Sequence, residues 1–411
     1  MINKHRFSIA LSVVIMGIGL LFFANQSRQQ QQPAEQVNKT QHHAPSGVVS
    51  VDVKVVNDTV HLLLGRIDHG QASVWYQASL DQGQTWSPLV NTTKDLAITA
   101  KFHRGNDARL AVQGNHLVAV WMSRKEGAPH NAGSMTSIRS ADGGKTWQQA
   151  TTPADWDGPH GFFAIDGNDH QINLVWLDSR EQVEKGSQGL RYTSSQDGGV
   201  TWLENKTLDP QTCACCWNTA RFNDDGEFYV LYRDKHPSDM AIGKVNQQHQ
   251  WQRLNTVGEF NWDFQGCPHI GGSLGFDNNN YIHATVSTGH DDYAGVYYLN
   301  SSNQGQSWSL PTQLGDDSAV HSDLAVNQQG HITATWDHIT ETGFQISYAQ
   351  STDQGITWSE IKPLSAADKR SSHPRVVALN DHALVIWTEK ELDNSHSISM
   401  KLIANESTVD E

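Results

Sequence analysis

The four cysteines of this chain lie close together in the sequence, and their spacing is typical of a soft-metal site or of disulfides. Three of them stand within four positions, in Cys213-Ala214-Cys215-Cys216, and the fourth is in Gly266-Cys267-Pro268-His269. Thiolates with imidazoles nearby favour copper or zinc, and Cu(I) suits sulfur best. Three neighbouring cysteines exceed what a single disulfide needs. We therefore predict metal handling at Cys213, Cys215, Cys216 and Cys267, with copper as the expected cofactor and zinc as the second choice.

The alternative is one or two disulfides and no cofactor, most simply with Cys267 bonded to one of the other three cysteines. Four cysteines allow three complete pairings. On an extended strand, Cys213 and Cys215 would share one face while Cys216 would point to the other. The sequence leaves the metal site and the disulfides open.

Histidine recurs before strand-like segments, in FHRGNDAR, GPHGFFAI, GCPHIGG, VHSDLAV and SHPRVVAL. A single histidine at the start of a strand is usually a hydrogen-bonded structural residue, and a repeat can duplicate such a residue as easily as a ligand. Five at matching places beside all the cysteines are candidates for additional metal ligands. These candidates are His103, His160, His269, His321 and His373.

Arginine and aspartate also gather at these positions and at the ends of the strands that follow. Several guanidinium groups together can clamp a carboxylate through paired hydrogen bonds, which is a way to hold an acidic sugar. An Asp-x-Arg pair is equally suited to an ion pair between structural units. The candidate catalytic residues are Arg66, Asp68, Arg104, Arg180, Arg233 and Arg375.

A repeated motif indicates the elements that position these residues. The pattern S-x-D-x-G-x-T-W occurs in SLDQGQTW, SADGGKTW, SQDGGVTW, SSNQGQSW and STDQGITW. In such a segment the Asp bonds to nearby backbone amides, Gly takes a positive φ, and Trp begins the next strand and covers the turn. The motif therefore predicts a series of β-hairpins.

These segments resemble the Asp-box, or BNR, repeats of the sialidase-like β-propellers, and the resemblance covers nearly the whole chain after residue 46. It implies an all-β propeller of four-stranded blades. Seven second strands are recognisable, from TVHLLLGR to ALVIWTEK, so we predict seven blades, with six as the alternative. We expect a strand around Val48 to Val51 to complete the last blade. The C-x-C-C and G-C-P segments resemble those of a subset of Asp-box propellers, which implies no particular activity.

The resemblance also implies sialidase residues, namely an arginine triad, a Tyr nucleophile supported by Glu, and an Asp acid/base. This chain departs from that pattern. The first inner strand, GVVSVDVKVV, lacks the family's Arg-Ile-Pro, and the nearest counterpart is His373-Pro374-Arg375. His321-Ser322-Asp323-Leu324 stands where the family has Tyr-Ser-x-Leu. An exo-α-sialidase or related glycosidase is therefore the alternative function. A non-catalytic propeller that binds a glycan or a protein is the second alternative.

The composition excludes other classes of protein. The chain has 411 residues, with 29 Lys and Arg against 44 Asp and Glu, which gives a net charge of −15 and argues against a nucleic-acid partner. It contains 33 Gly, 14 Trp and 21 His, and no long segment has apolar residues at the helical period. A helical bundle is thereby excluded.

The first 24 residues predict export. Lys4, His5 and Arg6 precede the uncharged run Ser8 to Ala24, which is typical of a signal peptide or an N-terminal membrane anchor. Residues 25–46 are rich in Gln and predict a disordered linker. We expect the propeller to span residues 47–405, with a tail at 406–411, in the periplasm or outside the cell. The expected partners are a metal ion or a glycan, with membrane attachment if the first segment is retained.

Overall fold

The computed structural model describes residues 46–341 and 343–405. The signal or anchor predicted for residues 1–24, almost all of the linker and the 406–411 tail lie outside the described residues. The described residues belong to one compact unit. None of its helices is long and apolar enough to span a membrane, as far as the described residues go. The 3₁₀ turn η1 (Pro129–Asn131) interrupts a structure otherwise made of strands.

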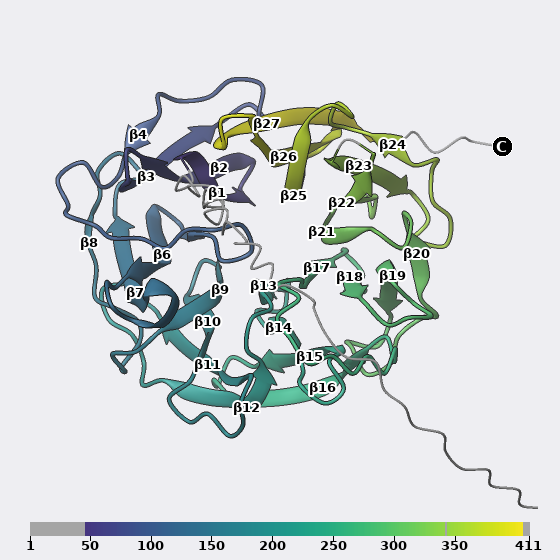
Figure 1. Cartoon of the computed structure of the whole chain (residues 1–411), viewed down its shortest axis with the longest axis horizontal. Helices are drawn as coiled ribbons and strands as arrows, with labels where there is room; N and C mark the ends of the chain where they lie inside the picture. Colours follow the sequence, from purple (N-terminus) through teal and green to yellow (C-terminus); the bar gives the residue numbers. More distant parts are fainter. Residues whose placement is uncertain (1–45, 342, 406–411) are drawn as a thin grey trace, which may run out of the picture. The chain divides into compact units, whose positions relative to one another are not determined.

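The strands form sheets arranged around a common axis (Figure 1). The chain passes through each sheet from the axis outward, which defines one blade. Blade 1 is β1 (Ser46–Val56), β2 (Thr59–Asp68), β3 (Gln71–Ser79) and β4 (Val90–Asn91). Blade 2 is β5 (Arg109–Gln113), β6 (His116–Arg124), β7 (Ala132–Ser140) and β8 (Gln148–Gln149). Blade 3 is β9 (His160–Gly167), β10 (Ile172–Asp178), β11 (Ser187–Ser195) and β12 (Lys206–Cys213).

The same order continues through the second half of the chain. Blade 4 is β13 (Thr219–Phe222), β14 (Phe228–Arg233), β15 (Met240–Val245) and β16 (Trp251–Val257). Blade 5 is β17 (Gly272–Phe276), β18 (Ile282–Thr288), β19 (Gly295–Ser301) and β20 (Thr312–Leu314). Blade 6 is β21 (Val320–Val326), β22 (Ile332–Thr340), β23 (Gly343–Ser351) and β24 (Lys362–Pro363). Blade 7 is β25 (Arg370–Ala378), β26 (His382–Lys390) and β27 (Ser395–Ala404).

The two ends of the ring join in one continuous sheet, with the order β25-β26-β27-β1-β2-β3-β4. Residues Ser46 and Gly47 pair in parallel with Ser395 and His396 of β27. The rest of β1, including Val48 to Val51, is the inner strand of blade 1 and pairs with β2. Of the described residues, Ser46 and Gly47 thus form the expected closing strand, whereas Val48 to Val51 pair with β2.

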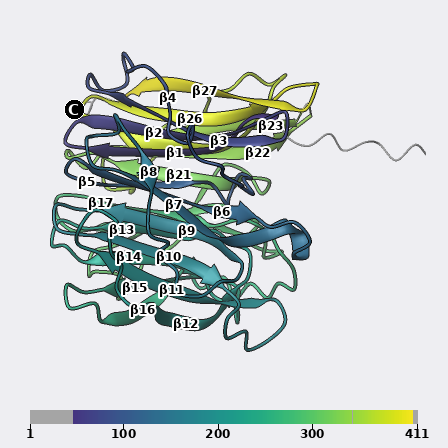
Figure 2. The same cartoon turned by 90° about the vertical axis from the view of Figure 1, so that its left-hand side faces the viewer.

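The hydrophobic core lies between the blades rather than within one centre. One cluster joins blades 1 and 2 through Tyr76 and Trp121, and another joins blades 7 and 1 through Leu384 and Leu62. Comparable clusters join each other neighbouring pair of blades. In the side view the sheets lie one above another (Figure 2). The all-β, sialidase-like propeller is confirmed, and this ring of cores is consistent with seven blades.

The Asp-box segments adopt the expected turn at the outer end of the blades. Around Asp142, the hydroxyl of Ser140 donates to Oδ1 at 2.8 Å, and the backbone amide of Thr146 donates to the same oxygen at 2.9 Å. Gly144 has a φ of +88°, and a Cβ there would lie 2.2 Å from the ring of Tyr76 in blade 1. The turn therefore requires glycine both for its backbone conformation and for close packing on the preceding blade.

The inner strands begin with bulges at the opening of the channel. The pairing register shifts in β9, β21 and β25, beside Phe162, His321 and His373. These residues have φ values of 57°, 42° and 55°, and His269, just before β17, has 56°. A bulge redirects the side chain at the end of a strand. The axial mouth, as we call this end of the channel, is therefore built from a repeated backbone irregularity.

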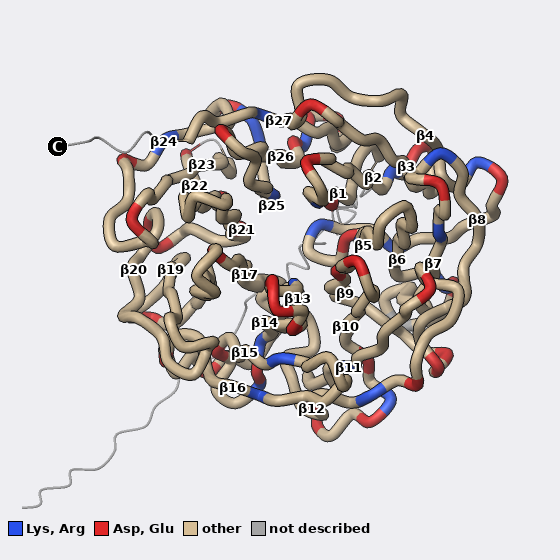
Figure 3. Tube along the Cα trace, turned by 180° about the vertical axis from the view of Figure 1, so that it is seen from behind, with Lys and Arg blue, Asp and Glu red and all other residues tan. Residues whose placement is uncertain are grey.

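The charged residues are distributed around the ring in short groups. Figure 3 shows basic and acidic segments interspersed, without a continuous basic stripe across the view. The pattern agrees with the sequence argument against a phosphate-rich partner.

Candidate functional site

The first group at the axial mouth is the thiol cluster, which we define as Cys213, Cys215, Cys216, Cys267 and His269. Cys213 ends β12, the outer strand of blade 3, and a turn at Ala214 and Cys215 leads to the inner strand of blade 4. The expectation of an extended strand here is wrong. Because the backbone turns, all three neighbouring sulfurs converge instead of alternating between two faces.

The geometry of the thiol cluster is that of a set of ligands. The Sγ of Cys213 lies 3.9 Å from that of Cys215 and 3.4 Å from that of Cys216. Ligand atoms of Cys215, Cys267 and His269 also lie within 4.8 Å of one another. No cysteine in the described part of the chain is in a disulfide, so the alternative of one or two disulfides is not shown. Cys215 therefore connects the three neighbouring cysteines with Cys267 and His269.

Burial differs sharply across the thiol cluster. Cys213, Cys215 and Cys216 are buried, whereas Cys267 and His269 are exposed. Hydrogen bonds from the other two thiols lower the pKa of Cys213, first from Cys215 and then from Cys216. Burial raises the pKa of Cys216 to about 12, while the positive charge of Arg233 acts in the opposite direction. The cluster is therefore a buried set of sulfurs with one open, solvent-facing side.

His103 lies next to the thiol cluster. Its ring lies 6.1 Å from that of His269 and 6.4 Å from that of Phe162. The pKa of His269 is lowered, first by partial desolvation of its ring, although the residue as a whole is exposed, and then by the neighbouring His103. A neutral imidazole is the form that binds metals.

The second group at the axial mouth is the imidazole pair, His321 and His373. Their rings stack with centroids 3.7 Å apart. The buried carboxylate of Asp337 forms a hydrogen bond with Nδ1 of His321 at 2.9 Å and accepts another from the backbone amide of His373 at 2.8 Å. Burial, followed by the adjacent His321, lowers the pKa of His373 well below its usual value. Trp217 packs beside both rings, at 5.5 and 6.0 Å.

His160 lies apart from both groups. It is buried at the start of β9, where Nδ1 accepts a bond from the amide of Met135 at 3.0 Å, and Trp156 and Trp176 pack on its ring. Its Nε2 lies 4.0 Å from Asp178. The structure therefore does not bring His160 to the thiol cluster or the imidazole pair.

The predicted catalytic arginines do not converge on one point. Arg66 pairs with Asp68 at the end of β2, at 3.3 Å. Arg180 pairs with both Asp178 and Asp155. Arg233 donates to the carbonyls of Ser238 and Ser287, at 2.6 and 2.7 Å, beneath Trp262. These side chains stabilise individual turns and neighbouring blades.

Arg104 and Arg375 are the exception, because both approach Asp107 inside the channel. Arg104 donates to that carboxylate at 2.8 Å and to the carbonyl of His373 at 2.5 Å. Arg375 lies farther away, 3.8 Å from the same carboxylate. The sequence did not single out Arg109, which pairs with Asp52 at 3.1 Å in the same space. It also did not single out Trp217, although that residue directly follows Cys216.

Comparison with solved structures gives likenesses at low sequence identity. An ulvan lyase in complex with a saccharide has a TM-score of 0.60 and 12% identity, covering 88% of this chain and 95% of the other. The polysaccharide lyase Uly1 has a TM-score of 0.55 and 9% identity, covering 93% and 95%. A leech intramolecular trans-sialidase has a TM-score of 0.48 and 10% identity, covering 88% and 68%.

The fold is that of a sialidase-like β-propeller. No family model matches the chain, and no curated protein matches it. At these identities the likeness describes the backbone alone. The side chains of the axial mouth must therefore carry the argument about function.

Proposed function

We propose that this propeller binds a soft metal ion, Cu(I) in preference to Zn²⁺, through the thiol cluster. The observation that carries the proposal is the spacing of the sulfurs. A tetrahedral ion with bonds of about 2.3 Å to sulfur separates its ligands by roughly 3.8 Å. The separations of Cys213 from Cys215 and from Cys216, 3.9 and 3.4 Å, lie on either side of that value. The thiols need little rearrangement to share one ion.

The arrangement also favours exchange over permanent storage of the metal. Three sulfurs are buried, but Cys267 and His269 are exposed on the solvent side. A ligand set with an accessible side allows a donor or acceptor molecule to approach the ion, whereas a closed structural site does not. We therefore propose handling of the metal, meaning uptake and release, as the role of the axial mouth.

The test is metal binding by the full chain under reducing conditions. The wild type is titrated with Cu(I) against a chromophoric chelator, and its free thiols are counted. We expect stoichiometric binding, at least a hundredfold weaker in the variant Cys213→Ser with Cys215→Ser. His283→Gln is the matched control, because it changes a buried histidine away from the thiol cluster. Wild-type protein with four reactive thiols and no bound Cu(I) would overturn the proposal, as would fully paired cysteines.

The same titration with Zn²⁺ distinguishes the two ions. Tighter binding of Zn²⁺ than of Cu(I) would retain the site and reject the choice of copper. We expect the opposite, because thiolate-rich sites prefer the softer cation.

Glycan recognition is the second candidate. It is supported by the likeness of the fold to two polysaccharide lyases. Turnover of a fluorogenic sialoside or depolymerisation of acidic polysaccharides would support this candidate. Inactivity on the whole panel would reject a catalytic role.

A further inference from the structure

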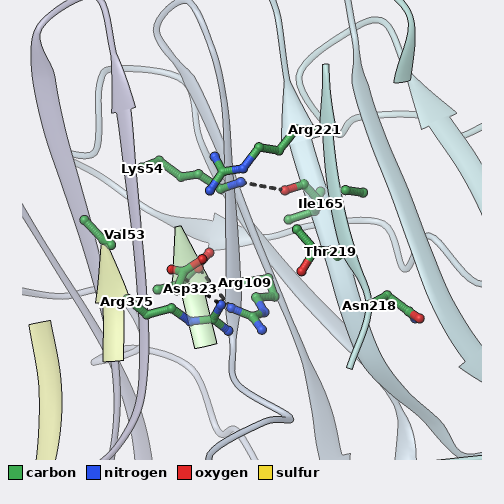
Figure 4. Close-up of a pocket in the computed structure, with 12 residues that line it drawn as sticks. Val53, Lys54, Arg109, Ile165, Asn218, Thr219, Arg221, Asp323 and Arg375 are labelled. Carbon is green, nitrogen blue, oxygen red and sulfur yellow. Dashed lines mark hydrogen bonds and ion pairs between the residues drawn. The ribbon is translucent and has the colours of Figure 1, made fainter. Parts of the chain in front are cut away.

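A second polar site lies inside the channel, beyond the axial mouth. It is a cavity of about 40 Å³ lined by the middle residues of several inner strands. Four cationic side chains line it, and we call them the channel cations: Lys54, Arg109, Arg221 and Arg375. Figure 4 shows Arg109 and Arg375 pointing toward each other, with Lys54 and Arg221 extending into the same space. We propose that the channel cations bind a small tetrahedral oxyanion of the phosphate or sulfate type.

The carboxylates around this cavity are already bonded to other donors. The carboxylate of Asp323 accepts hydrogen bonds from the hydroxyl of Ser273 at 2.5 Å and from the backbone amides of Leu324 and Val376 at 3.1 and 3.0 Å. The carboxylate of Asp52 accepts hydrogen bonds from the guanidinium of Arg109 and from the backbone amide of Leu110. Neither carboxylate depends on Arg375 or Arg221 for its bonding.

Asp107, just toward the mouth, is saturated in the same way. Its carboxylate accepts hydrogen bonds from the backbone amides of Val51 and Gly105 and from the guanidinium of Arg104. A carboxylate has room for about four donors. Asp107 therefore leaves little capacity for a further cation.

Two of the channel cations have donors without close acceptors. The nearest carboxylates to Arg375 are those of Asp107 at 3.8 Å and Asp323 at 4.0 Å, beyond hydrogen-bond distance. Arg221 makes no side-chain hydrogen bond or ion pair with any described residue, and its Nε is buried without a partner. A guanidinium offers five N–H donors. Arg221 is partly exposed, so the cost of an unpaired buried donor applies to its Nε.

The charges around the cavity also favour an anion. Its lining carries four cations against the carboxylates of Asp52 and Asp323. Lys54 is further paired with Asp166 at 3.2 Å, which leaves an excess of one positive charge. The whole chain, in contrast, has a net charge of −15. The pKa of Arg375 is lowered to about 10, by burial first and then by repulsion from Arg109. An oxyanion would offset this excess and accept the unused N–H groups.

The size of the cavity is sufficient for a small ligand. A water molecule needs about 10–15 Å³ of such space. A cavity of about 40 Å³ therefore has room for a compact ion. Its lining shares no residue with the thiol cluster.

The test is isothermal titration of the full chain with inorganic phosphate and, separately, with sulfate, at constant ionic strength in chloride. We expect saturable binding of at least one of the two to the wild type. Arg221→Gln and Arg375→Gln should each weaken it at least tenfold. Arg370→Gln, an exposed change on the same strand as Arg375, should bind like the wild type.

The outcomes separate clearly. Absence of binding by both oxyanions, or unchanged binding in Arg221→Gln, would overturn the proposal. Arg221→Gln is the decisive variant, because the side chain has no protein partner to lose and the fold should survive. Binding that persists in the Cys213→Ser, Cys215→Ser variant would show that the channel site and the thiol cluster act independently. Loss of oxyanion binding in that variant would contradict their separation.

Discussion

The outer Asp-box turns and the axial mouth both contain features that recur around the ring, but the turns share side chains whereas the mouth shares a backbone conformation. The outer turns repeat the side chains and their bonds, so that Asp81, Asp142, Asp197 and Asp353 each bond to a Thr four residues later. The mouth repeats a backbone bulge with positive φ and varies the side chain it presents. A repeat with fixed side chains maintains the fold. A repeat with fixed backbone and varied side chains is suited to building a site.

The largest effect is expected at the mouth, for Asp337→Ala. Its carboxylate holds both members of the imidazole pair, and its removal leaves the ring of His321 and a buried amide without their acceptor. We expect a loss of about 3 kcal/mol in the free energy of unfolding. Chemical denaturation measures it, with Asp337→Asn as the control that retains one acceptor oxygen. A loss below about 1 kcal/mol for the alanine variant would contradict a central role for this carboxylate.

The next effect separates the two regions by pH. Burial lowers the pKa of His160 from 6.5 to about 4, so the unfolded chain binds a proton that the folded chain does not. Stability should therefore fall as the pH falls from about 6.5, and this contribution should level off near pH 4. Hydrogen bonds from Thr146 lower the pKa of Asp142 to about 2, so stability from the outer turns should be lost only below about pH 4.

Denaturation curves across pH test these two ranges. Between about pH 7 and 4.5, the free energy of unfolding of His160→Gln should fall by on the order of 2 kcal/mol less than that of the wild type, because the titrating group is gone. The slope below pH 4 should remain, since the Asp-box carboxylates are intact. An unchanged slope in the upper range would mean that His160 does not titrate as its burial implies.

A smaller effect is expected at a single outer turn. Asp142→Ala removes the acceptor for Ser140 and for both donors of Thr146. We expect a loss of about 1–2 kcal/mol, less than at Asp337, because water reaches the exposed donors. Thermal and chemical denaturation provide the measurement. Asp142→Asn should retain most of the stability, and an equal loss in both variants would contradict the importance of the shared acceptor.

The smallest effect is a gain. Asn303 occupies the Asp position of one box, where its amide nitrogen donates to Ser307 at 2.8 Å and its oxygen accepts the amide of the same residue. Asn303→Asp should make these bonds charge-assisted, as in the other boxes, and add up to about 1 kcal/mol. A midpoint of denaturation that falls would indicate that this turn differs from its relatives.

Much of the fold was predictable because it depends on local rules that each blade repeats. The Asp and Gly positions of the box define the turn by hydrogen bonds within five residues and by a positive φ, as seen for Asp142 and Gly144. The closure was predicted less well. The sequence could not show that, within the described part of the chain, the pairing of β1 with β27 is limited to Ser46 and Gly47, since that depends on where β1 leaves β27 for β2.

The candidate site was only partly predictable for the same reason. The recurrence of histidine indicated the mouth, but His160 faces two tryptophans whereas His321 stacks on His373. Arg221 carried no signal in the sequence, because the lack of a partner for its side chain is a property of the assembled ring.

By itself, the sequence determined the all-β class, the repeated turns and the concentration of sulfur in two short segments. Each of these depends on residue type and short spacing, which operate before the chain folds. Only the tertiary structure decided that Cys213, Cys215 and Cys216 converge through a turn, and that four cations from separate blades face one cavity. The three cysteines are neighbours in the chain, but the turn that joins them lies between two blades. The four cations are far apart in the chain, and closing the ring is what brings them together.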